Sequence, residues 1–399
     1  MKKKPVNETV EGESDDFTID LIKSLNKEHG SRIAYNLASD ESPTHVKRWI
    51  STGSTLLDYN VSNRRDGGLP EGRIIEIFGP PSIGKSHIAL QICKTTQKMG
   101  GIVVYIDTEN GTSVENLHML GVNVNRGFVY VDTHCTEEVF EVAEKTIMKA
   151  KGMAKDIPIT IVWDSVAASS PKAELLGEYE KDTIGLQARA ISKCMRKITG
   201  IIGDQSILFV ILNQIRTKIG VMHGDPTTTP GGMAIPFHAS VRIKLSSGMP
   251  IKNKADEVIG INVIAKTIKN KVAAPFRTAN FEIHFGRGIV EHEQLFDVLR
   301  DAGERTVGDN IIVASGNNAW KVFTVTSISQ SKVIIEKKFY KSEFNEMLVS
   351  PVYGPYLQDL IEAVMVRKMG EPHVSDIDED SYEEVRAALM DIAEDSLST

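Results

Sequence analysis

The chain is poor in cysteine, and it has no long apolar run and no excess of positive charge. Its three cysteines, Cys93, Cys135 and Cys194, are scattered without the spacing of a metal site. This excludes a disulfide framework and favours small buried thiols in a reducing compartment. No apolar stretch approaches the roughly 20 residues that span a bilayer, and the lysines after Met1 lead into polar residues rather than a signal sequence. These absences predict a cytoplasmic protein that uses no membrane.

The net charge of the chain is -7, with an isoelectric point near 5.9. A protein that is basic over its whole surface is excluded, so any contact with nucleic acid must come from a local basic groove. The 399 residues are 41% hydrophobic and 25% charged. This composition is typical of globular proteins with two or three domains and one large core.

A glycine-rich loop is the most informative stretch, and it stands between a predicted buried strand at 73–78 and a predicted helix at 87–93. It fits the pattern G-x-x-x-x-G-K-[ST] at every fixed position. Such a loop points backbone N–H groups and a helix amino terminus at a polyphosphate, while its lysine reaches the β and γ phosphates and its hydroxyl binds Mg²⁺. The loop comprises Gly79, Pro80, Pro81, Ser82, Ile83, Gly84, Lys85 and Ser86. We therefore expect nucleotide binding here, and the flanking elements disfavour the alternative of a chance glycine-rich turn.

Strands and helices alternate after this loop, with strands at 102–107, 128–131 and 158–164 and helices between them. The alternation predicts an α/β fold with a parallel sheet and helices on its faces. Asp164 ends the last of these apolar strands, where a carboxylate can accept from Mg²⁺-bound water and from Ser86. Because strands often end in aspartate, the prediction that Asp164 completes a metal site depends on the preceding loop.

Hydrolysis also needs a group that orients or deprotonates the attacking water. Glu109 comes two residues after Asp107, which ends a strand, so it belongs to the carboxyl edge of the sheet, where ligands of open parallel sheets bind. It is our candidate base. On pattern alone, a solvated loop carboxylate is an equally good interpretation.

Two later segments carry positive charge near the predicted site. One is an amphipathic basic helix, and the other is a stretch rich in glycine, threonine and basic residues, 215–232, that follows a strand ending in Asn213 and Gln214. A loop that leaves the sheet beside a γ phosphate can change state with the nucleotide. Arg216 and Lys218 are candidates for nucleic-acid phosphates, and a plain flexible loop is the alternative.

The ends of the chain differ from this core. Residues 1–15 are polar without periodicity and predict a disordered leader. A helix from Asp16 to Gly30 and a strand at 32–37 cannot bury their own apolar faces, so they either fold back on the core or dock on another copy. Beyond 295 an aromatic-rich region precedes a helix at 356–369. Ten acidic residues then stand against Arg386 alone, which predicts a solvated tail.

Several segments together resemble the RecA recombinases. They span about residues 30 to 300 and are more specific than a phosphate loop alone. The matching segments are 50–54 (ISTGS), 68–73 (GLPEGR), the phosphate loop, 163–168 (WDSVAA), 171–174 (PKAE), 213–216 (NQIR), 218–222 (KIGVM), 231–232 (GG), 239–242 (ASVR) and 269–276 (KNKVAAPF).

The resemblance implies a RecA-like P-loop ATPase core with a sheet that is mostly parallel. It implies oligomerisation through a helix and strand within residues 1–45 and a core at 46–295. Beyond the core, the change in composition leads us to expect a small α+β domain at 296–370, and the excess of acidic residues predicts an acidic tail at 371–399. The implied activity is that of a DNA-dependent ATPase, with ATP and Mg²⁺ as cofactors. Such a protein forms a helical homo-oligomeric filament on single-stranded DNA, pairs it with homologous duplex DNA and exchanges strands.

The resemblance also implies roles for single residues. Glu109 is similar to the catalytic glutamate and Gln214 to the sensor of the γ phosphate. Lys269 and Lys271 are similar to a pair that reaches the ATP of the neighbouring subunit. Phe285 and Gly286 are expected beside the base, and Phe237 at the subunit interface. The two DNA-binding loops correspond to 177–185 and 214–230, and the DNA-contacting positions are Arg189, Arg196, Arg216, Lys218, Gly231 and Gly232.

The chain departs from the family pattern at four positions. Asn116 replaces the aromatic residue beside the adenine, and Ser113 stands where an acid is expected. His223 replaces an aromatic residue of the second loop, and Pro230 precedes the paired glycines. Two other functions on the same core stay open, a DNA-translocating ring helicase and a regulatory recombinase paralogue without enzymatic activity.

Overall fold

The computed structural model describes residues 7–37, 44–150, 157–177, 185–205, 207–217, 227–316 and 320–367. The chain divides into two compact units. The first comprises residues 1–62 with 66–295, and the second comprises residues 63–65 with 296–399. Most of loop 177–185, most of loop 214–230 with Lys218 and His223, and the predicted acidic tail lie outside the described residues.

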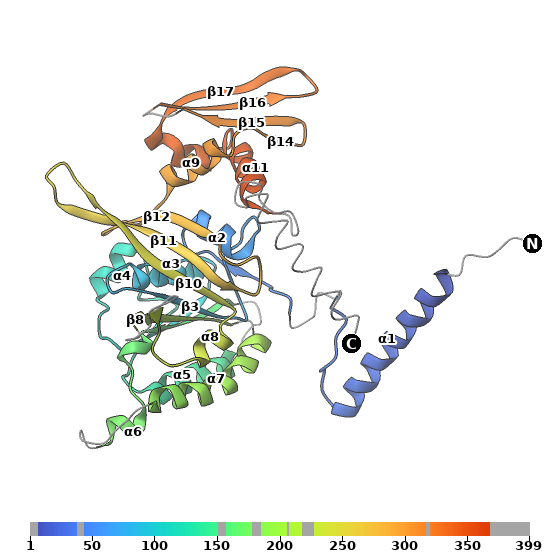
Figure 1. The fold of residues 1–399 in the computed structure, drawn as a ribbon, viewed down its shortest axis with the longest axis vertical. Helices are drawn as coiled ribbons and strands as arrows, with labels where there is room; N and C mark the ends of the chain where they lie inside the picture. The colour runs from blue at the N-terminus through green and yellow to red at the C-terminus, as the bar shows by residue number, and fades with distance from the viewer. Residues whose placement is uncertain are drawn as a thin grey trace, which may run out of the picture. The chain divides into compact units, whose positions relative to one another are not determined.

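A nine-stranded sheet forms the centre of the first unit (Figure 1). Its strand order is β13-β12-β11-β10-β3-β7-β6-β4-β5, in which the strands from β10 to β5 are parallel and the others antiparallel. The strands are β3 (Ile74–Gly79), β4 (Ile102–Asp107), β5 (Phe128–Asp132), β6 (Ile159–Asp164), β7 (Ile207–Gln214), β10 (Val241–Lys252), β11 (Val258–Asn270), β12 (Thr278–His284) and β13 (Gly288–Val290). The mostly parallel α/β sheet predicted from the sequence is confirmed.

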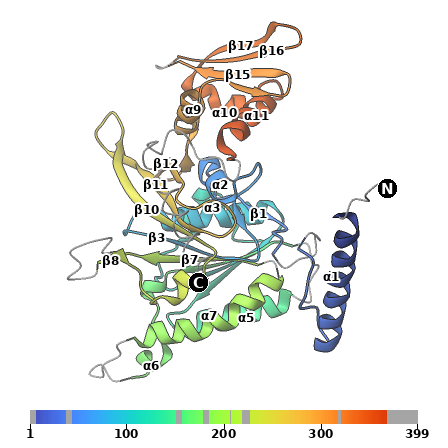
Figure 2. The same ribbon diagram turned by 45° about the vertical axis from the view of Figure 1, so that its right-hand side comes forward.

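Helices cover both faces of this sheet, so its inner strands are buried along almost their whole length and consist mostly of apolar residues. Helices α5 and α7 lie side by side on one face (Figure 2), and α8 packs against α7. Phe140 of α5 packs edge-on against Trp163 of β6, with ring centres 5.4 Å apart. The helices of this unit are α2 (Thr55–Ser62), α3 (Lys85–Lys98), α4 (Val114–Leu120), α5 (Thr136–Ala150), η1 (Val166–Ala168), α6 (Lys172–Leu175), α7 (Leu186–Gln205) and α8 (Ala234–His238). Two short pairs complete it, β1 (Trp49–Ile50) with β2 (Leu69–Pro70) and β8 (Arg216–Thr217) with β9 (Thr227–Thr228).

The segment before the core differs from its prediction in two ways. Helix α1 (Asn7–His29) begins nine residues earlier than expected, so the prediction of a disordered leader is wrong for residues 7–15. Gly30 ends the helix with a positive φ of 65°, as expected. The predicted strand at 32–37 is absent, because Ile33 and Ala34 donate their N–H groups to the side chain of Asn26 instead of to another strand. A strand needs a neighbouring strand to satisfy its backbone groups, and none of the strands that the structure describes pairs with this segment.

The second unit is a four-stranded antiparallel sheet with helices on one face (Figure 1). Phe296, Phe339 and Phe344 pack together in its core. Its elements are α9 (His292–Asp301), β14 (Arg305–Val307), β15 (Asn310–Ser315), β16 (Trp320–Ser327), β17 (Lys332–Tyr340), η2 (Lys341–Glu343), α10 (Phe344–Val349) and α11 (Gly354–Met365). The sequence predicted the last helix at 356–369, which is two residues too late at its start, and it did not predict the strands.

None of the described helices has the length and apolar character that crossing a membrane requires. All three cysteines are free thiols, so the expectation that the chain has no disulfide is confirmed.

A buried carboxylate on α2 predicts how the stability of the first unit depends on pH. Asp58 accepts hydrogen bonds from Thr52 and Ser51, and burial raises its pKa to about 7. The native state therefore keeps a proton that the unfolded chain releases above about pH 4, so the free energy of unfolding falls between about pH 4 and pH 7 and is level above. We expect Asp58→Asn to remove up to about 4 kcal/mol of that fall, since the pKa is raised by about three units.

Urea unfolding of the first unit at intervals between pH 4.5 and pH 8 measures this effect. The control is Asp256→Asn, which changes an exposed carboxylate in the same unit. Identical pH slopes for the wild-type protein and Asp58→Asn would contradict the prediction.

Candidate functional site

A cavity of about 420 Å³ lies where the phosphate loop leaves β3, at the carboxyl edge of the parallel strands. It contains residues that the sequence placed in separate segments. Its lining comprises Pro81, Ser82, Gly84, Lys85, Ser86, His87, Glu109, Asp164, Gln214, Ile261, Ile283 and Phe285. The fold thus brings the phosphate loop together with Glu109, Asp164, Gln214 and Phe285.

The shape of the phosphate loop requires glycine. Gly84 has a φ of 93°, and a Cβ atom there would lie 2.3 Å from Cδ1 of Ile283. Helix α3 begins at the next residue, so its unpaired N–H groups open onto the cavity. The Nζ atom of Lys85 donates to the carbonyl oxygens of Gly79, at 3.2 Å, and of Pro80, at 2.7 Å. Burial lowers the pKa of Lys85, while Asp164 and Glu109 oppose that shift.

Oxygen ligands suited to Mg²⁺ lie next to Lys85. The Ser86 hydroxyl donates to Oδ2 of Asp164 at 2.8 Å, and the Tyr105 hydroxyl donates to the same oxygen at 2.6 Å. Burial raises the pKa of Asp164, and these two hydrogen bonds oppose the rise. Among the described residues no cluster of three or more metal-binding side chains occurs. A hydroxyl and a carboxylate fit Mg²⁺ in a nucleotide site, because Mg²⁺ usually keeps several waters and takes its other ligands from phosphates.

Glu109 is held at the rim of the cavity by two neighbours. Its Oε1 atom accepts from the Ser165 hydroxyl and, at 3.1 Å, from Nε2 of Gln214. The loop that carries it is fixed by Asp107, whose carboxylate accepts from the backbone N–H groups of Glu109 and Thr112. A carboxylate oriented in this way can position a water molecule at the cavity.

Sequence reasoning did not find two residues that hold this site. Tyr105 holds Asp164, and Ser165 holds Glu109. The sequence could have indicated a role for Ser165, because this residue directly follows the strand-ending Asp164. It could not have indicated a role for Tyr105, because a tyrosine inside an apolar strand is usually a core residue.

The residues expected near the base form one side of the cavity. Phe285 is 53% exposed and lines it. A Cβ atom on Gly286 would lie 2.9 Å from the sulfur atom of Met119, so the chain passes close to α4 there. Ser113 caps that helix by accepting from the N–H group of Asn116, at 3.2 Å. Ser113 therefore has a structural role at the position where the family pattern expects an acid.

A second hollow, of about 400 Å³, contains Arg216, Gly231 and Gly232. Both glycines have a positive φ and pack against the amino-terminal end of α7: a Cβ atom on either would lie 2.9 Å from a side chain, of Ile191 or of Ala188. The exposed Arg189 lies on this end of α7. Four candidate DNA contacts thus lie around the ends of the two loops.

Arg196 is not part of this hollow, because it lies about 10 Å beyond Arg189 along α7. It belongs with Lys269 and Lys271, whose charges act on the same histidine, His238. The register aligns Lys269 with Arg242 and Glu76, which puts it about 10 Å short of Gly79 along the strand direction. Its Nζ atom donates to the carbonyl oxygens of residues 236 and 237 at 2.7 and 2.9 Å. Neither lysine lines the cavity of its own chain, as far as the described residues show.

These cations surround a histidine. Burial lowers the pKa of His238, and the charges of Arg196, Lys269 and Lys271 lower it further. Burial, with the charges of Lys271 and Arg242, also lowers the pKa of Lys269. This edge of the sheet is therefore a local site of positive charge.

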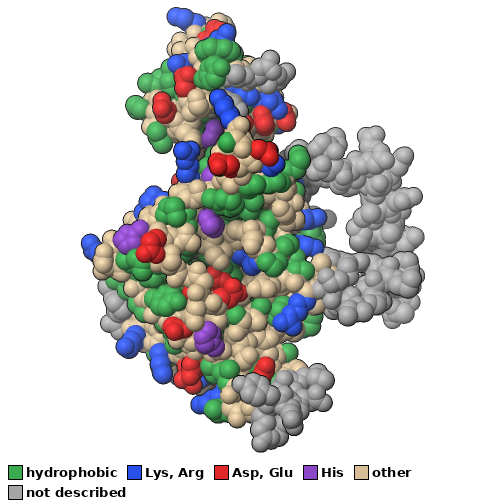
Figure 3. Space-filling model, turned by 90° about the vertical axis from the view of Figure 1, so that its left-hand side faces the viewer, with side chains coloured by type: hydrophobic (Ala, Val, Ile, Leu, Met, Phe, Trp, Pro, Cys, Tyr) green, Lys and Arg blue, Asp and Glu red, His purple; other side chains and the backbone are tan. Residues whose placement is uncertain are grey.

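The charges on the visible face in Figure 3 are mixed, with basic, acidic and histidine side chains interspersed among polar and apolar surface. This agrees with the net charge of -7. On this face a nucleic acid would have to bind in local grooves, because it offers no broad basic surface.

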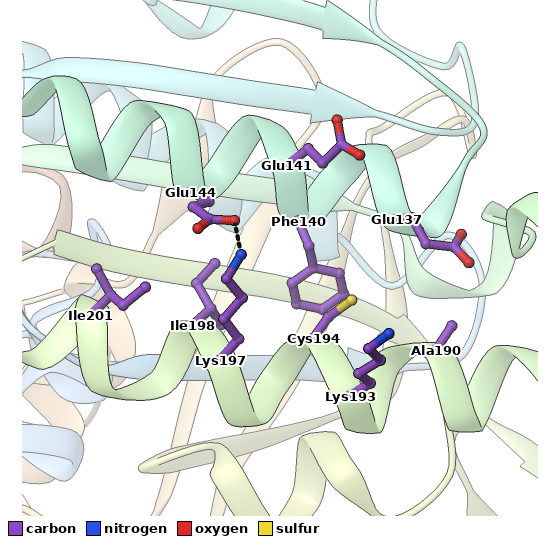
Figure 4. Close-up of a pocket in the computed structure, with 10 residues that line it drawn as sticks. All are labelled: Glu137, Phe140, Glu141, Glu144, Ala190, Lys193, Cys194, Lys197, Ile198 and Ile201. Carbon is purple, nitrogen blue, oxygen red and sulfur yellow. Dashed lines mark hydrogen bonds and ion pairs between the residues drawn. The ribbon is translucent and has the colours of Figure 1, made fainter.

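A further cavity, of about 300 Å³, lies between α5 and α7. Phe140, Cys194 and Ile198 form its floor, and Glu144 pairs with Lys197 at 2.7 Å on its rim (Figure 4). Its walls are helix side chains, without a glycine-rich loop or a helix amino terminus that would bind phosphate. It does not resemble a nucleotide site.

Comparison with known proteins gives the family. The model of the RecA N-terminal domain matches residues 18–290. Protein RecA of Chlorobaculum tepidum is 38% identical over 322 residues, which cover 81% of this chain and 87% of that protein. Protein RecA of Staphylococcus aureus (strain JH9) is 35% identical over 371 residues, which cover 93% of this chain and 96% of that protein. The chain belongs to the RecA family.

Membership of the RecA family confirms the resemblance found in the sequence. The protein is a RecA-type recombinase and a DNA-dependent ATPase, which binds nucleotide and DNA and forms filaments. A ring helicase and a non-enzymatic paralogue are not favoured.

Proposed function

We propose that this RecA-family protein binds ATP with Mg²⁺ in the 420 Å³ cavity and polymerises on single-stranded DNA as a helical homo-oligomer. The filament then pairs that strand with homologous duplex DNA and exchanges strands. The observation that carries the proposal is the convergence of the phosphate loop, Asp164, Glu109 and Gln214 on one cavity from four strands of the sheet. We place the protein in the cytosol, where its free thiols are stable.

In this proposal Lys85, Ser86 and Asp164 hold the nucleotide and its metal. Lys85 exchanges its contacts with loop carbonyls for the β and γ phosphates, and Ser86 and Asp164 supply oxygen ligands. Mg²⁺ held by these residues would polarise the phosphoryl oxygens. Glu109 orients the attacking water, and Phe285 with Gly286 contacts the base.

Gln214 is proposed to report the γ phosphate to the DNA. It ends β7, donates to Glu109 and begins the segment that leads to Arg216 and the second loop. A change in its contacts when the γ phosphate is bound or lost would therefore move the residues that grip DNA. Arg189, Arg196, Arg216, Lys218 and the glycines 231 and 232 are the proposed DNA contacts, and the affinity should be sensitive to salt and nearly independent of sequence.

Assembly is proposed to complete the ATPase site. Lys269 and Lys271 lie at the edge of the sheet opposite the cavity, so they suit the nucleotide of an adjacent subunit better than their own. Two cations supplied in this way stabilise the charge of the transferred phosphoryl group only within a filament.

The leading segment is proposed to join the subunits. Strand β5 is the edge of the sheet, with Val129 and Tyr130 exposed, and its outer backbone groups can pair with another strand. Residues 32–37 have strand character, and no strand in the described part of the chain pairs with them. The exposed Phe237 is a second interface candidate.

Strand exchange tests the proposed function directly. We expect the protein, with ATP and Mg²⁺, to convert a circular single strand and a homologous linear duplex into joint molecules and then into nicked circles, as resolved on agarose gels. A non-hydrolysable ATP analogue should support pairing but slow release, because it fixes the γ-phosphate state. A heterologous duplex is the control. Absence of joint molecules under conditions in which the protein coats the single strand would overturn the proposal.

A further inference from the structure

A glutamate lies in the middle of the central sheet, where the surrounding strand is apolar. Glu76 is on β3 between Ile75 and Ile77, and it is 0% exposed. Its two carboxylate oxygens have separate partners. Oε1 accepts from Nδ2 of Asn213 at 3.0 Å, and Oε2 accepts from Nε of Arg242 at 2.5 Å.

The first partner, Asn213, lies beside the proposed nucleotide sensor and also contacts the base of the second loop. Asn213 is also 0% exposed, and it directly precedes the proposed sensor Gln214 on β7. The same Nδ2 group donates to the carbonyl oxygen of Pro230 at 3.1 Å. Pro230 is the residue before Gly231, at the point where the second loop returns to the core. One side-chain amide thus joins Glu76 to both ends of the segment between Gln214 and Gly231.

The second partner, Arg242, leads across the sheet from β3 towards β11. Arg242 on β10 is aligned with Glu76 on β3 and with Lys269 on β11, so the three residues stand side by side across three strands. The Arg242 guanidinium also lies 4.8 Å from the ring centre of Phe78, one residue before the phosphate loop. The contacts of Glu76 therefore reach from the base of the loop to the strand position beside the lysine pair.

Such a group is not explained by stability alone. A buried ion pair pays a desolvation cost that often cancels its attraction, and well-packed apolar residues in its place are often as stable or more so. A carboxylate whose two oxygens bind residues on two different strands can, however, transmit a change from one strand to the other, since loss of either contact leaves a buried charge unsatisfied.

We propose that Glu76 is a positioning residue that couples three parts of this recombinase: the sensor end of β7, the base of the second loop, and the lysine pair that serves the adjacent subunit. The proposal rests on the proposed function of Gln214, Lys269 and Lys271. DNA held at the loop then fixes Asn213 and, through Glu76 and Arg242, aligns Lys269 for the neighbouring nucleotide. Coupling of this kind is reciprocal, so nucleotide at the interface also tightens the grip on DNA.

The test compares Glu76→Gln with a matched control, Glu71→Gln. Glu71 is a similarly buried glutamate of the same unit, and its ion-pair partner, Arg48 at 3.0 Å, is not a residue of the proposed site. We expect Glu76→Gln to keep its ATP affinity within about twofold and to lose about tenfold or more of the stimulation of ATPase by single-stranded DNA. Glu71→Gln should keep that stimulation even if it loses as much thermal stability.

A second variant protects the test against misfolding. Asn213→Ala leaves the pair of Glu76 with Arg242 intact but removes its link to β7, and it should lose DNA stimulation to the same extent. Because both changes break one path, the double variant should lose no more than either single variant.

The outcomes are distinct. If the wild-type protein itself shows no stimulation by DNA, the proposed function fails and this inference fails with it. If the wild-type protein is stimulated and both Glu76→Gln and Asn213→Ala are stimulated equally well, only the inference fails. Equal losses in Glu71→Gln and Glu76→Gln would show a purely structural role and would also overturn it.

Discussion

Replacing Lys85 by alanine is expected to abolish ATP-dependent filament growth on single-stranded DNA. The Nζ atom of Lys85 lies in the cavity and is partly desolvated, so its charge-assisted contact with phosphate is strong and its loss is not compensated by water. A contact of this kind corresponds to at least about a hundredfold in nucleotide affinity. Titration with a fluorescent ATP analogue and electron microscopy of protein on single-stranded DNA measure the two effects.

Lys98→Ala is the matched control, because Lys98 ends the same helix and is exposed. It should bind ATP and form filaments like the wild-type protein. Unaltered filaments with Lys85→Ala would remove Lys85 from the proposed site, whatever the affinity measured for the free protein.

Glu109→Gln is expected to separate binding from hydrolysis. The amide keeps the shape of the carboxylate but cannot take a proton, so ATP affinity should stay within about twofold while turnover falls about a hundredfold or more. Filaments should therefore form normally and dissociate slowly. Single-turnover hydrolysis of labelled ATP on single-stranded DNA is the measurement. Glu115→Gln, an exposed acid on α4, should retain normal turnover.

Mixing two inactive variants tests whether the site is shared. In random filaments of Glu109→Gln and Lys269→Ala subunits, about a quarter of the interfaces combine an intact glutamate with intact lysines from the neighbour. The mixture should thus recover up to about a quarter of the wild-type ATPase, although each variant alone has almost none. No recovery in filaments shown to contain both variants would contradict the assignment of Lys269 to the adjacent nucleotide.

The core could be predicted from the sequence because its signals are local. The apolar runs that form β4 and β6 end at the residues the pattern indicated, Asp107 and Asp164, since both faces of these strands are buried. The shape of the phosphate loop is determined by residues within the loop itself, namely the positive φ of Gly84 and the contacts of Lys85 with loop carbonyls. Parallel strands place their carboxyl ends at one edge, so the meeting of Glu109 with Asp164 follows from the topology.

The features that could not be predicted depend on residues far away in the sequence or on another copy of the chain. Residues 32–37 have the composition of a strand, but none of the described strands pairs with them. Glu76 gives no signal in the sequence, because Asn213 and Arg242 follow it by 137 and 166 residues. Strands β14 to β17 were missed because their alternation was interpreted only as an aromatic-rich region.

If the lysine pair serves the adjacent nucleotide as proposed, its separation from the cavity makes the two ends of a filament chemically different. At one end the terminal molecule presents a nucleotide that no neighbour completes, and at the other end it presents cations without a nucleotide. In the proposed arrangement the first of these molecules would keep its ATP, while every interior molecule would hydrolyse it. A growing polymer of this protein would thus carry an ATP cap at one end only, and that asymmetry gives its growth and shrinkage a direction.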